Sequence, residues 1–107
     1  MTFKINGISW KIQMKSANNS VFKDGDNEYL GFCVYSTQTI ILRDDMPKEL
    51  LEQTLIHELT HAFVFSFGLS GCKFDEEKLC NFVGAHLKRI HRITKQYMKG
   101  LLNGTLP

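Results

Sequence analysis

Long apolar runs are absent from this sequence of 107 residues, and so are the usual marks of export. No stretch approaches the roughly 18 apolar residues that are needed to span a bilayer. Residues 1–15 mix Lys, Asn and Gln with apolar residues, so they lack the apolar segment of a secretory signal peptide. We therefore expect a cytoplasmic protein without a membrane partner.

Cysteine and net charge are also scarce. The three cysteines, Cys33, Cys72 and Cys80, form no C-x-x-C pair, which indicates reduced thiols rather than a disulfide framework. The net charge of +2 is too small to indicate nucleic-acid binding. We interpret the Lys and Arg residues between positions 88 and 99 as the solvated face of a helix, and we expect no direct nucleic-acid partner. The length and the absence of repeats indicate a single domain, residues 1–107.

Alternating apolar and polar residues predict a sheet in the first part of the chain. Residues 3–15 alternate in this way, with a turn at Asn6-Gly7, as in a half-buried strand. Two more apolar runs, residues 31–35 and 39–42, are joined by a short connection and predict a hairpin. The polar residues 16–29 between these segments are typical of a loop.

Two helices are predicted after the strands. The first spans about residues 47–67, with Asp44 or Asp45 as its N-terminal cap. The second spans about residues 76–99 and is capped by Asp75. Strands followed by helices predict an α+β fold, in which a small twisted sheet of about three to four strands packs against two helices.

The first predicted helix contains the segment His57-Glu58-Leu59-Thr60-His61. Residues four apart lie on one face of a helix, so the two imidazoles can bind one metal ion with Glu58 beside them. A lone histidine on such a helix would more simply be a packing residue. Two histidines at this spacing with a glutamate between them form the H-E-x-x-H pattern of zinc peptidases. We therefore expect one Zn²⁺ per chain, with His57 and His61 as ligands and Glu58 as the catalytic base.

A third ligand is needed, because a catalytic zinc ion keeps three protein ligands and an open position. Val64 and Phe67 occupy the positions where a metzincin would have Gly and His, which excludes that class. The remaining candidates are the acids that open the second helix, Asp75, Glu76 and Glu77. Helical periodicity puts Glu76 and Glu77 at opposite edges of one face and does not choose between them.

Two segments of the chain resemble the ImmA/IrrE-like family of small zinc metallopeptidases. These segments are TLIHELTHAF at residues 54–63 and EKLCNFV at residues 77–83, and a weaker resemblance extends over roughly residues 31–90. The resemblance implies a minimal zincin-like, gluzincin-like metallopeptidase with Glu77 as the third zinc ligand. It also implies that Asn81 stands where related enzymes use an acid to hydrogen-bond a histidine ligand, which an amide oxygen can also do.

Members of this family often occur in phages and other mobile elements, where some of them inactivate a repressor. The resemblance therefore implies proteolysis of a specific protein partner, such as a helix-turn-helix transcriptional repressor. The alternative is a non-catalytic binding or regulatory protein that keeps zinc on the same scaffold.

Three further side chains are candidates to stabilise the oxyanion of a tetrahedral intermediate. His86 lies on a stripe with core-facing helical spacing, so it is either a core histidine or such a donor. Tyr35 and Tyr97 are alternative donors, which the sequence does not rank. By analogy with other peptidases, the predicted hairpin offers a strand edge to which an extended substrate can add.

Overall fold

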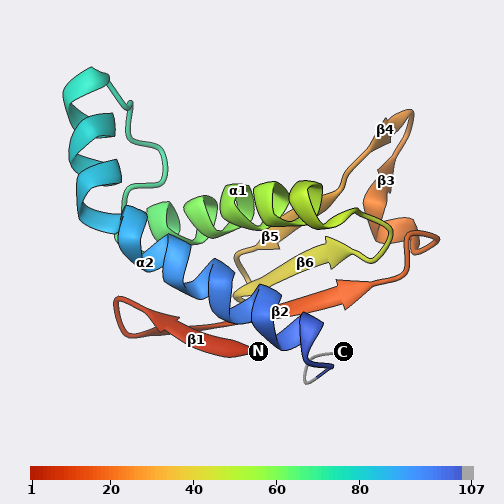
Figure 1. Cartoon of the computed structure of the whole chain (residues 1–107). Helices are drawn as coiled ribbons and strands as arrows, with labels where there is room; N and C mark the ends of the chain where they lie inside the picture. Colours follow the sequence, from red (N-terminus) through yellow and green to blue (C-terminus); the bar gives the residue numbers. More distant parts are fainter. Residues whose placement is uncertain (105–107) are drawn as a thin grey trace.

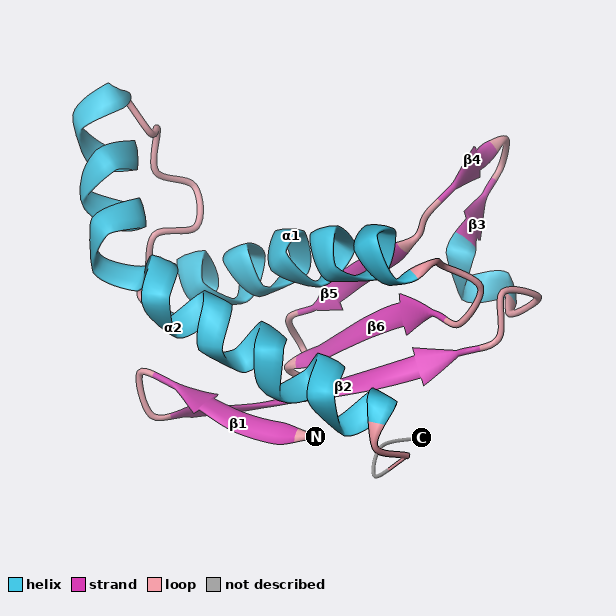
Figure 2. Cartoon of the chain, in the orientation of Figure 1, coloured by secondary structure: helices cyan, strands magenta, loops and turns pink. Residues whose placement is uncertain are grey.

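Four strands of the computed structural model form one sheet, and two helices cover it (Figure 1). The structure describes residues 1–104. The strands are β1 (Thr2–Ile5), β2 (Ile8–Lys15), β5 (Gly31–Val34) and β6 (Thr39–Arg43), and the helices are α1 (Lys48–Ser66) and α2 (Glu76–Leu102). Figure 2 shows the strand layer and the two helices as separate parts of the molecule. The predicted α+β fold is confirmed, and within residues 1–104 no helix has the length and apolar character that crossing a membrane requires.

The sheet has the strand order β1-β2-β6-β5 and mixes antiparallel with parallel pairs. β1 and β2 form an antiparallel hairpin through Asn6-Gly7, where both residues have the positive φ that Asn and Gly tolerate best. β5 and β6 form a second antiparallel hairpin, as predicted. The two hairpins join through a parallel pairing of β2 with β6, in which Ile12 lies opposite Ile40. Alternation within a strand gives no information on this last pairing.

The segment between β2 and β5 is more ordered than the predicted loop. It contains a 3₁₀ turn at Ser20–Phe22 and a small hairpin of β3 (Lys23–Asp24) with β4 (Asn27–Glu28). The Phe22 side chain is only 1% exposed and packs edge-on against Phe32, with ring centroids 5.9 Å apart. Successive side chains of a strand point to opposite faces, so Phe32 points away from α1. The segment between β2 and β5 therefore covers the face of the sheet that is opposite α1.

The main core lies between the sheet and the two helices. Trp10 of β2 is fully buried there, and its indole Nε1–H donates a hydrogen bond of 2.8 Å to Oγ of Ser66. This bond ties the last turn of α1 to the sheet. The buried members of the core are Ile5, Trp10, Ile12, Ile40, Leu42, Leu51, Leu55, Leu59, Ala62, Phe63, Phe82, Ile90, Ile93, Tyr97 and Met98.

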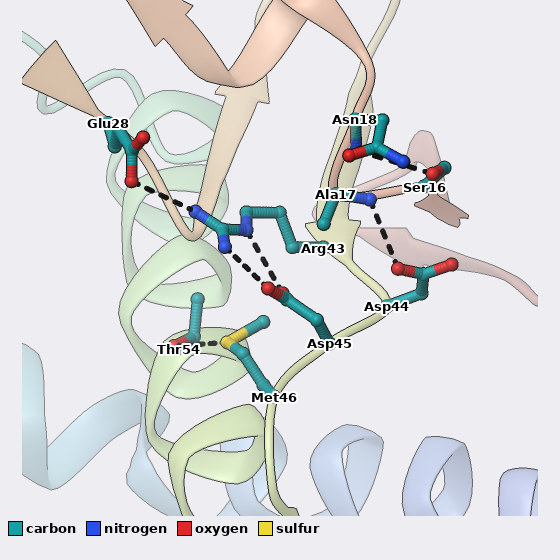
Figure 3. Close-up of polar contacts among 9 residues, drawn as sticks. All are labelled: Ser16, Ala17, Asn18, Glu28, Arg43, Asp44, Asp45, Met46 and Thr54. Atoms are coloured by element: carbon teal, nitrogen blue, oxygen red, sulfur yellow. Dashed lines mark hydrogen bonds and ion pairs between the residues drawn. The ribbon is translucent and has the colours of Figure 1, made fainter.

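The predicted aspartate cap of α1 is wrong. Pro47 takes the N-cap position and makes no side-chain cap bond. Figure 3 shows the two aspartates engaged elsewhere: Asp44 accepts a hydrogen bond of 3.1 Å from the backbone N–H of Ala17, and Asp45 accepts from the guanidinium of Arg43. These bonds fasten the connection between β6 and α1 to neighbouring segments. Both carboxylates therefore have partners other than the end of α1, and the partner of Asp45 is a cation.

The strand β5 approaches α1 closely at Gly31. A Cβ atom at this position would lie 2.9 Å from the carbonyl oxygen of Ile41 and 3.2 Å from Cγ2 of Thr54. We expect Gly31→Ala to force these groups apart and to lower the free energy of unfolding by about 1–3 kcal/mol, as overpacking does elsewhere. Urea-induced unfolding measures this loss.

The matched control is Gly84→Ala in the exposed part of α2. Nothing lies within 4 Å of a Cβ built there, and its φ is not positive. Alanine in a helix interior is more favourable than glycine by roughly 0.5–1 kcal/mol, so this variant should be more stable than the wild type. Equal changes in the two variants would contradict the close approach of β5 and α1.

Candidate metal centre

The buried face of α1 sets the direction of each residue in the H-E-x-x-H segment. Glu58 belongs to this face and is only 6% exposed, whereas His57 and His61 are exposed beside it. The helix therefore holds the carboxylate inward and the two imidazoles at the surface, one turn apart. The buried face consists of Leu51, Thr54, Leu55, Glu58, Leu59, Ala62, Phe63 and Ser66.

His57, Glu58 and His61 form a group that fits a metal ion. One ligand atom of each residue lies within 4.8 Å of those of the other two, and the imidazole ring centroids are 4.9 Å apart. In the part of the chain that the structure describes, this is the only such group of three His, Cys, Asp or Glu residues. Two imidazoles with a carboxylate are a donor set that zinc accepts.

Burial shifts the protonation equilibria of this group. Burial raises the pKa of Glu58, although the nearby His57 opposes the shift. A raised pKa brings the carboxyl group nearer to the pKa that a general base needs at neutral pH. Burial, and then the charge of His57, lowers the pKa of His61. A lowered pKa favours the neutral imidazole, which is the form that binds a metal.

A groove of about 310 Å³ opens beside the group. One wall is α1, including His57 and Glu58, and the other is the chain that leads into β5. β5 lies at the edge of the sheet, so its outer backbone edge faces away from β6 and suits the addition of an extended peptide. The residues that line the groove are Glu28, Tyr29, Leu30, Gly31, Leu50, Gln53, Thr54, His57 and Glu58.

The sequence did not predict the strand-side wall of this groove. Tyr29 ends the predicted loop, Gly31 begins the predicted strand, and Leu30 between them belongs to neither prediction. Gly31 was the signal that could have found it, because a glycine inside a strand pattern often marks the close approach of another backbone.

Cys33 lies in β5, and Tyr35 follows directly after the end of this strand. Side chains two positions apart on a strand share a face. Burial and the charge of Glu58 raise the pKa of Cys33 to about 12, and burial, Cys33 and Glu58 together raise the pKa of Tyr35. The Tyr35 ring stacks on Phe65 with centroids 4.9 Å apart. Tyr35, an expected oxyanion donor, therefore feels the charge of Glu58 but does not line the groove, and Cys33 is a further group near Glu58 that was not predicted.

Glu77 does not belong to the group. It lies with Glu76 in the first turn of α2, which Asp75 caps as predicted by accepting a 2.8 Å hydrogen bond from the N–H of Lys78. All of residues 75–81 are exposed. Figure 1 shows this end of α2 projecting away from the body of the molecule. Ligation by Glu77 therefore stays a prediction, as does ligation by Glu76.

Asn81 and His86 line a separate pocket of about 330 Å³ between α2 and the loop before it. The His86 ring centroid lies 4.4 Å from that of Phe67 and 4.8 Å from that of Phe82, and burial lowers its pKa. Such packing agrees with the interpretation of His86 as a histidine at the boundary of the core. Tyr97, the other proposed donor, is a core residue with 2% exposure. The structure does not bring these three residues to the groove that His57 and Glu58 line.

No protein-family model, curated protein or solved structure matches this chain. The interpretation of the group around Glu58 therefore rests on its donor atoms, their spacing and their burial.

Proposed function

We propose that this chain is a zinc-dependent metallopeptidase that hydrolyses peptide bonds in a specific protein partner. The observation that carries the proposal is the position of Glu58, a buried carboxylate with two imidazoles within 4.8 Å at the wall of a groove. Among residues 1–104, no Lys or Arg forms an ion pair with it. A buried acid without a cationic partner weakens a fold, so its presence here favours a chemical role.

His57 and His61 would hold the zinc ion through their ring nitrogens, with Glu77 as the proposed third ligand. When bound, zinc would supply a Lewis acid and lower the pKa of a water molecule toward about 7. Glu58 takes the proton from the attacking water and delivers it to the leaving amine. The Tyr35 hydroxyl donates a hydrogen bond to the developing oxyanion, and the edge of β5 holds the substrate extended.

A non-catalytic zinc protein is the second candidate, and one observation favours it. The group contains two imidazoles and Glu58 but not Glu77. If Glu58 itself binds the ion, it cannot act as the base, and the metal then serves stability or recognition. The two candidates agree on the metal and differ on whether a peptide bond is cut.

The proposed partner is a helix-turn-helix transcriptional repressor of a phage or mobile element. This proposal rests on the resemblance of residues 54–63 and 77–83 to the ImmA/IrrE-like family.

We expect the zinc-loaded protein to cleave a repressor encoded beside its own gene at one or a few positions. Mass spectrometry of the products identifies these positions. Treatment with 1,10-phenanthroline should stop cleavage and added Zn²⁺ should restore it, because the metal is required for the reaction. Casein is the control, since many unrelated cuts in casein would indicate a general peptidase. The absence of cleavage in both substrates would contradict the proposal.

A further inference from the structure

Basic residues are concentrated in α2, and the small net charge of the chain hides this concentration. Residues 78–104 contain six Lys or Arg and no Asp or Glu, although the whole chain has 13 basic and 11 acidic residues. The remainder of the chain is therefore net acidic. Such a separation of charge produces a strong local field on a nearly neutral protein.

Four of the cations lie in one stripe on the exposed face of α2. Lys88, Arg92, Lys95 and Lys99 follow each other at intervals of three or four residues, so their side chains share a face. At about 1.5 Å per residue the stripe is roughly 16 Å long. His91 and Gln96 join these four residues around a shallow depression. In Figure 1 this part of α2 is the blue segment that crosses the front of the molecule.

The charges of this stripe are poorly neutralised within the protein. Nζ of Lys95 lies 3.7 Å from Oε1 of Glu52, but the Lys95 side chain is still 56% exposed. Among the described residues, no ion pair involves Lys88, Arg92 or Lys99. Like charges also stand four residues apart at Lys88–Arg92 and Lys95–Lys99, which destabilises a helix by repulsion. An anion lying along the stripe would remove this repulsion.

We propose that this face of α2 binds the phosphate backbone of a double-stranded nucleic acid. Protein interfaces are centred on apolar and aromatic side chains, and none lines this depression. An amphipathic helix binds a membrane through a free apolar face. Along the stripe Ile90, Ile93 and Tyr97 are buried in the core, and the exposed large apolar residues of α2 lie before or after it, at Leu79, Val83, Leu87 and Leu102. A row of phosphates needs only cations and hydrogen-bond donors. The expectation of no nucleic-acid partner rested on the small net charge and on the interpretation of residues 88–99 as a solvated helix face. This proposal revises that interpretation and does not depend on the proposed peptidase function.

Fluorescence anisotropy with a labelled duplex DNA of about 20 base pairs tests the proposal. We expect binding at low salt that weakens steeply between about 50 and 200 mM, because phosphate contacts release counterions. The triple variant Lys88→Gln/Arg92→Gln/Lys99→Gln should bind at least about tenfold more weakly at low salt. Its slope of log affinity against log salt should fall by roughly three, about one for each cation removed.

The control variant Lys11→Gln/Lys23→Gln/Lys73→Gln removes the same charge from exposed sites elsewhere. It should keep most of the affinity and of the salt slope. A duplex RNA of the same sequence is tested in parallel, and the tighter binder of the two identifies the source of the phosphates. Three results would overturn the proposal: no binding to either duplex at low salt, equal losses in the two triple variants, or tighter binding of a polyglutamate peptide.

Discussion

Glu58→Gln is expected to retain zinc and to abolish peptide hydrolysis. Glutamine has nearly the shape of glutamate, so it fits the same place on the buried face of α1, but its amide cannot take up a proton at neutral pH. General acid–base catalysis contributes about 10²–10⁴-fold to a rate, so we expect the cleavage rate to fall by about 10³-fold. The free energy of unfolding should not decrease, because the variant removes a charge from a buried position.

The cleavage rate and the bound zinc are measured on the same preparations of wild type and variant. Glu49→Gln is the control, because Glu49 is exposed in the first turn of the same helix and takes no part in the group. It should cleave at the wild-type rate. A Glu58→Gln protein that binds zinc and still cleaves, or that still inactivates the repressor, would show that hydrolysis by Glu58 is not the function.

His57→Ala is expected to lose the metal. Zinc in proteins is held by three or four ligands in tetrahedral geometry, and this substitution removes one of the two imidazoles in the group. Elemental analysis of wild-type protein purified without added zinc should find about one equivalent, as a single site of this kind predicts. The variant should contain almost none. Added zinc should raise the melting temperature of the wild type only, because it stabilises the folded state that binds it.

The exposed histidine of α2 provides the matched control. His91→Ala should keep its zinc, since His91 lies outside the group. Comparing Glu77→Gln with Glu76→Gln in the same titration identifies the acid that completes the site. Wild-type protein that is free of metal and also fails to take up added zinc would overturn the metal centre and the peptidase proposal together.

Local patterns predicted those elements of the fold that depend on neighbouring residues. The alternation around Trp10 predicted β2, and the position of Asp75 before two glutamates predicted the start of α2. Elsewhere the same kind of argument was wrong, because contacts that the pattern does not show took precedence. Asp45 sits where a helix cap is expected but pairs with Arg43, and Phe22 anchors a segment whose polar composition is typical of a loop.

The same distinction applies to the candidate site. His57, Glu58 and His61 converge because their spacing on a single helix fixes their relative positions, and the sequence contains that spacing. The proximity of Tyr35 and Cys33 to Glu58 depends instead on which strand lies beside α1. The third ligand depends on how closely α2 approaches α1. Periodicity defines the face on which Glu77 lies and gives no information on that distance.

The parallel pairing of β2 with β6 has a consequence for the order in which the protein gains its properties during folding. It joins residues 28 positions apart, such as Lys11 and Thr39, and such non-local contacts form slowly. Before they form, the sheet lacks its β1–β2 half, and only the β5–β6 hairpin, which itself forms in about 1–10 microseconds, is there to cover Leu55 and Glu58. A histidine pair on one helical turn needs only a transient helix, which forms within about a microsecond. We therefore expect a newly made chain to acquire affinity for metal before it acquires the buried carboxylate on which catalysis would depend.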